Sequence, residues 1–414
     1  PSEIASIILK CIKEVAERHT GATVTQAVIS VPAYFNHAQR TATIEAARLA
    51  DLECLRLINE PTAAALAYGF KKDLEKRVAV YDLGGGTFDI SVLDIGAGVY
   101  ETLATGGNSY LGGEDFDYRV VDFLADQFKA EHGVDLREDR MSLQRLKDAA
   151  ERAKCELSFV DKTPLLVPRI YDNLNLETTL TRETLEDLVD DLIKETIRLT
   201  SEALREANVT LEELDEIILV GGMTRMPKVQ EAIRVFFGMA PCKGVHPEEV
   251  VAIGSAVQAF SLEDEADGHL LLDVTPFSLG IDTAGGYMGT VVDRNTTLPV
   301  SMTRTFTTVR DNQEVVKVVV RQGEGEKADD NEALGEFALE GIREAAKMEP
   351  RIDVTFKIDA NGILHVTAMD RDTGEAQAVR IRDYMEKAAG EGVATTDVQL
   401  AKDLEEGAAG GGGA

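Results

Sequence analysis

The fold is decided largely by the stretch Val78-Ala79-Val80-Tyr81-Asp82-Leu83-Gly84-Gly85-Gly86-Thr87-Phe88-Asp89. Its apolar run predicts a strand that leads into three consecutive glycines, followed at once by a hydroxyl and a carboxylate. Glycines let the backbone adopt positive φ and approach a ligand closely, and their N–H groups can form a nest for phosphate oxygens. Asp82 and Asp89 would repel bare phosphate, so the pattern favours a magnesium ion between them. A glycine-containing hairpin turn is the alternative interpretation.

The composition indicates a globular protein of two or three domains. The chain has 414 residues, of which 44% are hydrophobic and 28% charged, and its formal net charge is −30. This acidic balance argues against nucleic acid or an anionic membrane surface as a partner. No apolar run is long enough to predict a transmembrane helix. The widely spaced cysteines favour a reducing compartment, and we expect a cytoplasmic location.

Residues 1–95 alternate between helical and strand patterns, which predicts an α/β domain with parallel strands. Its strands are expected at 27–31, 54–58, 78–83 and 217–220, with a return strand at 90–95. Helices are expected at 3–18, 37–50, 62–69, 115–130, 140–158, 182–207 and 248–261, and Pro227 suits the first turn of a further helix.

The sequence changes character at Leu262. Residues 263–268 are acidic and small, as in a linker, and the short apolar run Leu270-Leu271-Leu272-Asp273 follows. Beyond it, residues 351–358 alternate strictly, and Asn361-Gly362 is a strong hairpin signal. We expect a β-sandwich that ends near residue 382, and a disordered glycine and alanine tail over 407–414.

Glycine clusters recur at 84–86, 112–113 and 221–222. Three such turns in one α/β region favour a nucleotide site in which phosphates lie between two lobes. The chain has no GxxxxGK[ST] motif, and no GxGxxG opens a helix, which disfavours a P-loop and a dinucleotide fold.

Several polar residues are candidates for the same site. Glu60 follows a predicted strand, where α/β proteins place ligand sites, although it also suits a helix N-terminus. Glu151, Lys154 and Ser158 share one helix face, for which a solvated stripe is the default interpretation. Arg225 could stack on an adenine ring, but exposed surface arginines are equally common.

The same segments resemble the DnaK-type, seventy-kilodalton heat-shock chaperones, nearly continuously from residue 1 to about 382. The resemblance is carried by segments 31–36, 58–65, 82–89, 111–117, 221–227, 270–281 and 359–366. It implies an α/β actin-like ATPase domain over 1–262, without the N-terminal part of its first lobe, and a linker over 263–273. An all-β substrate-binding sandwich over 274–382 and a residual lid start with a tail over 383–414 would follow.

The resemblance also assigns ATP or ADP and Mg²⁺ to particular residues. Asp82 would hold magnesium through water, Thr87 and Asp89 would lie beside the transferred phosphate, and Glu60 would lie near the attacking water. The residues expected to contact the nucleotide are Gly84, Gly85, Gly86, Thr87, Gly112, Gly113, Glu151, Lys154, Ser158, Gly221, Gly222, Arg225 and Glu248.

Coupling between the domains is implied at a second set of residues. Pro32 and Arg40 match a proline and arginine pair that relays the nucleotide state to the linker residues Leu270, Leu271, Leu272 and Asp273. His37 stands where the family usually has Asp, and Ile44 where it usually has Lys.

The sandwich is implied to bind extended apolar peptides of unfolded proteins. Ile281, Phe306, Val316 and Val318 would line its pocket, while Ala284 and Val309 would arch over the peptide backbone. Main-chain hydrogen bonds would supply affinity, and the pocket would select an apolar side chain. Ordinary core positions are the alternative interpretation for these residues.

The chain begins with Pro1, so we expect a fragment that lacks the family's first phosphate loop and catalytic lysine. We therefore expect no useful rate of ATP hydrolysis, and fast peptide exchange without a lid. J-domain co-chaperones and nucleotide exchange factors are implied as partners, in a role in protein folding and the stress response. The alternatives are a nucleotide-independent peptide-binding holdase, and an actin-like kinase or filament protein.

Overall fold

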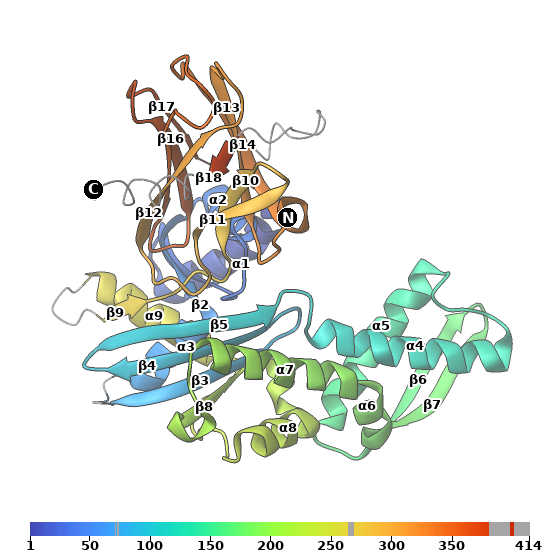
Figure 1. The fold of residues 1–414 in the computed structure, drawn as a ribbon. Helices are drawn as coiled ribbons and strands as arrows, with labels where there is room; N and C mark the ends of the chain where they lie inside the picture. Colours follow the sequence, from blue (N-terminus) through green and yellow to red (C-terminus); the bar gives the residue numbers. More distant parts are fainter. Residues whose placement is uncertain (71, 73, 264–268, 381–397, 401–414) are drawn as a thin grey trace. The chain divides into compact units, whose positions relative to one another are not determined.

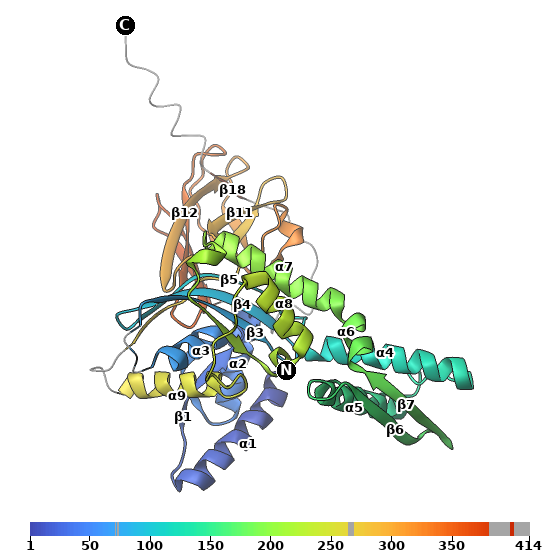
Figure 2. The same ribbon diagram turned by 90° about the horizontal axis from the view of Figure 1, so that it is seen from below.

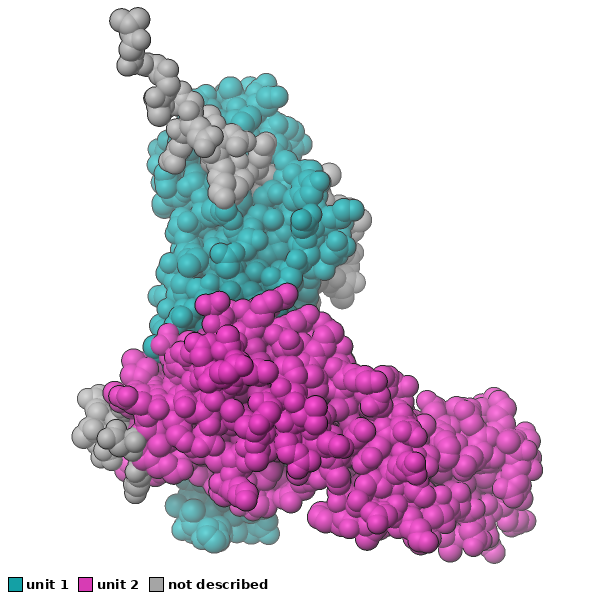
Figure 3. Space-filling model, turned by 60° about the horizontal axis from the view of Figure 1, so that its bottom comes forward, with its two compact units in different colours: residues 1–29, 35–57, 272–414 teal, residues 30–34, 58–271 magenta. Residues whose placement is uncertain are grey.

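The computed structural model describes residues 1–70, 72, 74–263, 269–380 and 398–400. The chain forms two compact units (Figure 3). Unit 1 comprises Pro1–Ile29, Phe35–Leu57 and Leu272–Ala414, and unit 2 comprises Ser30–Tyr34 and Ile58–Leu271. Residues 264–268 of the predicted linker at 263–273, the lid start at 383–387 and the tail at 407–414 lie outside the described residues.

Unit 2 is built on a five-stranded sheet with the strand order β8-β3-β4-β5-β9 (Figure 1). The strands β3, β4 and β5 pair antiparallel, while β8 runs parallel to β3. The prediction of a return strand after the glycines is therefore confirmed. The strand bounds are β3 (Lys76–Leu83), β4 (Phe88–Gly96), β5 (Val99–Asn108), β8 (Glu216–Val220) and β9 (Leu270–Leu272).

The expected set of parallel strands was only partly right. The strands β1 (Gln26–Val31) and β2 (Glu53–Asn59) form a two-stranded sheet of their own and do not join β3. Residues 105–107, which include two glycines, belong to β5. Gly107 is needed there because a Cβ would stand 2.4 Å from the Phe88 carbonyl oxygen.

Both faces of β3 are buried. Ala79, Tyr81 and Leu83 belong to the main core of unit 2, and the Tyr81 hydroxyl donates to Thr196 Oγ1 on α7 at 2.6 Å. Because successive side chains point to opposite faces, the fully buried Val78 and Val80 face the other side. A strand buried on both faces places its last polar residue, Asp82, at the edge of a rigid core.

Helices surround this sheet, and most predicted ones are found. Pro227 begins α8, as predicted. A cluster of α4, α5 and the hairpin β6–β7 lies at one end of unit 2 (Figures 1 and 2). The bounds are α3 (Glu60–Gly69), α4 (Gly113–His132), α5 (Arg140–Leu157), α6 (Arg182–Leu188), α7 (Asp190–Glu206), the 3-10 turn η2 (Gly222–Arg225), α8 (Pro227–Phe237) and α9 (Val250–Glu263).

Two features of this region differ from the predictions. The single helix expected at 182–207 is interrupted at Val189, whose ψ of 6° departs from helical geometry. The antiparallel hairpin of β6 (Lys162–Tyr171) and β7 (Leu174–Thr181) was not predicted. In the described part of the chain, no helix combines the length and apolarity needed to cross a membrane.

Unit 1 contains two kinds of structure. The first is α1 (Ser2–Thr20) and α2 (His37–Leu49) with the β1–β2 sheet, which share a small core around Ala47, Ala50 and Leu52. The helix α1 carries apolar side chains at helical spacing, and five of them are more than half exposed: Ile4, Ile7, Ile8, Ile12 and Val15.

The second part of unit 1 consists of two antiparallel sheets around one core. The sheet orders are β11-β10-β13-β14 and β17-β16-β15-β12-β18. Gly362 has φ of 75° in the turn between β15 and β16, as the Asn-Gly signal predicted. The bounds are β10 (Leu279–Thr283), β11 (Tyr287–Val292), β12 (Val300–Thr308), β13 (Val315–Gln322), β14 (Glu332–Glu340), β15 (Ile352–Ile358), β16 (Leu364–Asp370), β17 (Ala376–Arg380) and β18 (Val398–Leu400).

The strand β18 was not predicted. It pairs antiparallel with β12 and lies within residues 383–414, for which the resemblance implies a residual lid start and a tail. The sheet therefore includes residues beyond the expected end of the sandwich near residue 382.

Candidate functional site

Three acidic side chains meet in unit 2. Asp82 ends β3, Asp89 begins β4 opposite it, and Glu60 begins α3 after β2. Burial, and then the charge of Asp89, raises the pKa of Glu60 to about 7. Burial raises the pKa of Asp82 well above its usual range, with further contributions from Glu60 and Asp89. Such a carboxylate cluster attracts a cation.

The third acid of this cluster is fixed by a backbone contact. Asp89 is 1% exposed, and its Oδ1 accepts the backbone N–H of Tyr34 at 2.8 Å. Glu60 combines both roles weighed from the sequence, since it is the first residue of α3 and also part of the acidic cluster.

The glycine turn at 84–86 packs against the start of α4. The N–H of Gly84 donates to the Thr87 carbonyl at 3.0 Å, which closes the turn. The N–H groups of Gly113 and Glu114 donate to the carbonyls of Gly84 and Gly85 at 2.9 and 2.8 Å. A Cβ on Gly112 would stand 2.5 Å from the Gly86 nitrogen. Glycine at 112 is therefore required by close packing of two backbone segments.

The glycines at 84–86 do not adopt the positive φ that glycine allows. Positive φ occurs instead at Gly221, where φ is 85°. A Cβ on Gly221 would also stand 2.9 Å from Asp82 Oδ1. Around Gly85 and Gly86, by contrast, a Cβ would meet no atom within 4 Å. The fold itself leaves room over these two residues, so a ligand can approach their backbone.

A cavity of about 530 Å³ opens beside these turns. Its lining brings together many of the predicted residues: Gly84, Gly85, Gly113, Glu151, Lys154, Ser158, Gly222, Arg225 and Glu248. Gly86, Thr87, Gly112 and Gly221 are neighbours in the same turns without lining the cavity. The size lies within the range of small-molecule sites.

Lys154 is a buried cation, so the solvated stripe expected by default on its helix face does not describe it. Its Nζ donates to the Gly113 carbonyl and forms an ion pair with Asp117, each at 2.9 Å. Burial raises the pKa of Asp117, and Lys154 opposes this shift. The pair ties α5 to the first turns of α4.

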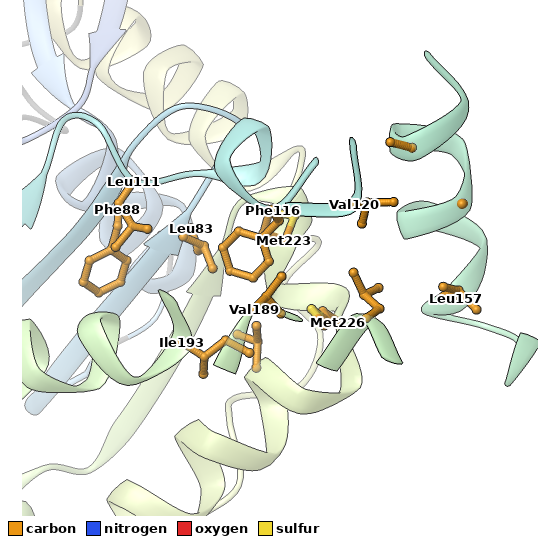
Figure 4. Packing of buried hydrophobic residues seen from close by; sticks show 14 of the residues in the cluster. Leu83, Phe88, Leu111, Phe116, Val120, Leu157, Val189, Ile193, Met223 and Met226 are labelled. Atoms are coloured by element: carbon orange, nitrogen blue, oxygen red, sulfur yellow. The ribbon is translucent and has the colours of Figure 1, made fainter. Parts of the chain in front are cut away.

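Arg225 is held on the cavity wall by two partners. Its Nε donates to Glu248 Oε1 at 2.7 Å, and its Nη2 lies 3.2 Å from His246 Nε2. Glu248, predicted as a nucleotide contact, thus positions the guanidinium. Met223 and Met226, which also line the cavity, belong to the same apolar core as Phe116 and Val189 (Figure 4).

Sequence reasoning missed part of the lining. The additional residues are Glu114, Asp117, Cys155, Phe159, Met223 and Met226. Asp117, at one turn from Gly113, could have been found by its helical spacing. Phe159 carries no such signal, because single exposed aromatic residues are common on protein surfaces.

The other predicted residues fall into both units. Pro32 lies in unit 2, and Arg40 is buried in unit 1, where its Nε donates to the Phe35 carbonyl at 3.2 Å. Leu271 is buried in β9, whereas Leu270 is 53% exposed. Asp273 is buried, and its carbonyl accepts the N–H of Leu298 at 2.7 Å.

The predicted peptide-contacting residues lie in the sandwich. The four expected pocket residues, Ile281, Phe306, Val316 and Val318, are completely buried in its core. This placement suits the ordinary-core interpretation, and ligand contact by these residues stays a prediction. Ala284 and Val309 are half-buried at strand ends.

A protein-family model described as Hsp70 protein matches residues 1–408. The chain belongs to the Hsp70 family. This confirms the resemblance at the level of the family, whose members are molecular chaperones with an actin-like, ATP-binding domain that act in protein folding. The mixed α/β sheet of unit 2 fits that domain.

The residues of this Hsp70 chain fit a nucleotide. Gly85 and Gly86 leave open space over their backbone, which suits phosphate oxygens. The cluster of Glu60, Asp82 and Asp89 suits a divalent cation held partly by water. In the described residues, no group of three or more His, Cys, Asp or Glu side chains is placed to ligate a metal directly. Magnesium bound through water at Asp82 does not require such a group.

Proposed function

We propose that this protein is an ATP-dependent chaperone that binds extended apolar segments of unfolded proteins under allosteric control by nucleotide. One observation carries the proposal of nucleotide binding. Open space lies over the backbone of Gly85 and Gly86, beside a cavity that is also lined by Lys154 and Arg225. In this proposal, residues 1–262 form the ATPase domain, 263–273 the linker and 274–382 the peptide-binding domain.

The nucleotide would be held by groups of different chemistry. The backbone at 84–87 and 112–113 would bind the phosphates, while Glu151, Ser158 and Arg225 would contact the nucleoside. Magnesium would neutralise charge between the phosphates and the acidic cluster. Asp82 would orient water on the ion, and Glu60 would hold a water molecule near the terminal phosphate.

Peptide binding would take place in the sandwich, with Val316 and Ile281 beneath the peptide and Ala284 and Val309 above it. Two states would connect the sites: nucleotide binding docks Leu270–Leu272 and opens the groove, and linker release traps the peptide. Partners would include J-domain co-chaperones and nucleotide exchange factors. We further propose a cytoplasmic location and a role in the stress response, on the basis of family membership and cysteine distribution.

Fluorescence anisotropy of a labelled apolar heptapeptide tests this coupling on the full chain. We expect faster peptide dissociation in Mg-ATP than in Mg-ADP. The Leu271→Asp variant should lose the difference because it places a charge at a buried linker position, whereas Leu262→Asp, at an exposed position on α9, should keep it. Peptide binding that is identical with and without nucleotide would instead support a nucleotide-independent holdase.

A further inference from the structure

Phe159 is an exposed aromatic side chain on the wall of the candidate nucleotide site. It lines the cavity, yet 76% of its surface remains accessible to water. The nearby lining residues Met223 and Met226 are 8% and 4% exposed. A flat apolar group that enters the cavity can cover this ring, and the removal of apolar surface from water is favourable.

The backbone that carries Phe159 is fixed on both sides of the residue. Its own N–H donates to the Glu156 carbonyl at 2.9 Å. Arg182 donates from Nε to the Leu157 carbonyl at 2.7 Å and from Nη2 to the Val160 carbonyl at 3.0 Å. The turn after α5 is therefore held in place while the ring is left uncovered. Contact with a ligand would require little ordering of the chain.

A second planar group comes from a different element. Arg225 belongs to η2, and its guanidinium is oriented by Glu248 and His246. The cavity thus combines two chemically distinct regions. The glycine turns offer backbone N–H groups and space, and Phe159 with Arg225 offers flat surfaces of the kind on which nucleobases stack.

We propose that Phe159 stacks on the base of the bound nucleotide. This contact gives a nucleotide a higher affinity than a polyphosphate that has no base. The inference rests on the proposed nucleotide site and assigns a specificity-determining contact within it. Stacking on an aromatic face tolerates any base, so the ring distinguishes nucleotides from base-free polyphosphates rather than one purine from another.

The protein offers a direct optical test because its sequence contains no tryptophan. The Phe159→Trp variant carries a single indole at the proposed stacking position. We expect its emission to change on titration of the full chain with Mg-ATP, and to stay constant with Mg-tripolyphosphate. Unchanged emission in a sample that calorimetry shows to be saturated with Mg-ATP would overturn the inference.

Affinity measurements provide the second test. Phe159→Ser should bind Mg-ATP about tenfold more weakly, which corresponds to about 1.4 kcal/mol and lies within the range of base stacking on an aromatic side chain. Its affinity for Mg-tripolyphosphate, measured by competition, should not change. The matched control is Val235→Ser, an equally exposed apolar position on α8 that does not line the cavity, and it should bind like the wild type.

The outcomes separate the two proposals. Equal ATP affinity of the wild type and Phe159→Ser would overturn the stacking role and leave the nucleotide site intact. Equal weakening for ATP and tripolyphosphate would also overturn it, because the ring would then only shape the cavity. Failure of the wild type to bind both Mg-ATP and Mg-ADP would overturn the stacking role and the proposed function together.

Discussion

The backbone N–H of Glu114 donates to the Gly85 carbonyl oxygen at 2.8 Å, and this bond joins the start of α4 to the turn between β3 and β4. Two glycine segments, far apart in the sequence, therefore form one surface. Phosphate binding by either segment would depend on the other, because a shift of α4 would also move the turn.

Gly112 and Gly85 should respond differently to the same substitution. Gly112→Ala places a Cβ about 2.5 Å from the backbone at 85–86, and we expect it to destabilise the protein by about 1–3 kcal/mol. Gly85→Ala meets open space, so its stability should change by less than about 1 kcal/mol while its affinity for Mg-ATP falls. Urea unfolding and calorimetry of both variants check this. Wild-type affinity in Gly85→Ala would show that phosphate does not approach this residue.

Lys154 should be important for stability as well as for the site. Lys154→Met leaves Asp117 without its buried ion-pair partner, and we expect a loss of about 2–3 kcal/mol. Lys147→Met, on the same helix, removes only an exposed contact with Tyr118 and should cost less than about 1 kcal/mol. Chemical unfolding measures both. Equal effects would contradict the role assigned to the Lys154–Asp117 pair.

His37 should make unit 1 sensitive to acid. Burial, followed by the charges of His365 and Arg40, lowers the pKa of His37 to about 4, while Asp359 acts in the opposite direction. Its Nδ1 accepts the Leu364 N–H at 3.3 Å, and its Nε2 lies 3.4 Å from Thr41 Oγ1. The neutral ring is therefore the form that the fold favours.

The folded protein binds this proton less tightly than the unfolded chain, whose histidine has a pKa of about 6.5. The contribution of neutral His37 to the free energy of unfolding is fully present above about pH 6.5 and is lost as the pH falls toward 4. We expect this contribution to fall by about 2 kcal/mol between pH 7 and pH 5. Between pH 7 and pH 5, the free energy of unfolding of His37→Gln should therefore fall by less than that of the wild type. His19→Gln, at an exposed position on α1, should behave like the wild type. A pH dependence in His37→Gln equal to that of the wild type would refute this role.

Val316 and Val354 provide a matched pair for the peptide site, since both are completely buried in the sandwich core. Val316→Ala and Val354→Ala should each cost about 2 kcal/mol of stability. Only Val316→Ala should alter the affinity for an apolar peptide, measured by anisotropy under conditions where both variants are folded. Equal peptide affinities would indicate that Val316 is an ordinary core residue.

Much of the fold could be predicted because local patterns and tertiary structure agree. The strand before the glycines, the helix that begins at Pro227 and the Asn361-Gly362 turn all have signals within a few residues. The hairpin β6–β7 was not predicted, and its first strand contains Pro164 and Pro168, residues that are unusual inside a sheet. In the structure these prolines are tolerated because the sheet has only two strands.

The site was harder to predict where its properties arise from distant segments. The glycine patterns identified the right turns, but the reason for glycine at 112 is the backbone at 85–86, which no local pattern reveals. The burial of Lys154 depends on Asp117 in another helix. Phe159 lines the cavity from a turn whose carbonyls at Leu157 and Val160 accept hydrogen bonds from Arg182, and this contact has no signature in the sequence.

We propose above that the glycine turns and the acidic cluster bind a nucleotide with magnesium. Isothermal titration calorimetry of the full chain with ATP, in the presence and absence of Mg²⁺, tests it most directly. We predict saturable binding with one site per chain that is stronger with Mg²⁺, and an Asp82→Asn variant in which the magnesium dependence is reduced. Absence of binding heat from the folded wild-type protein with both Mg-ATP and Mg-ADP would contradict the claim.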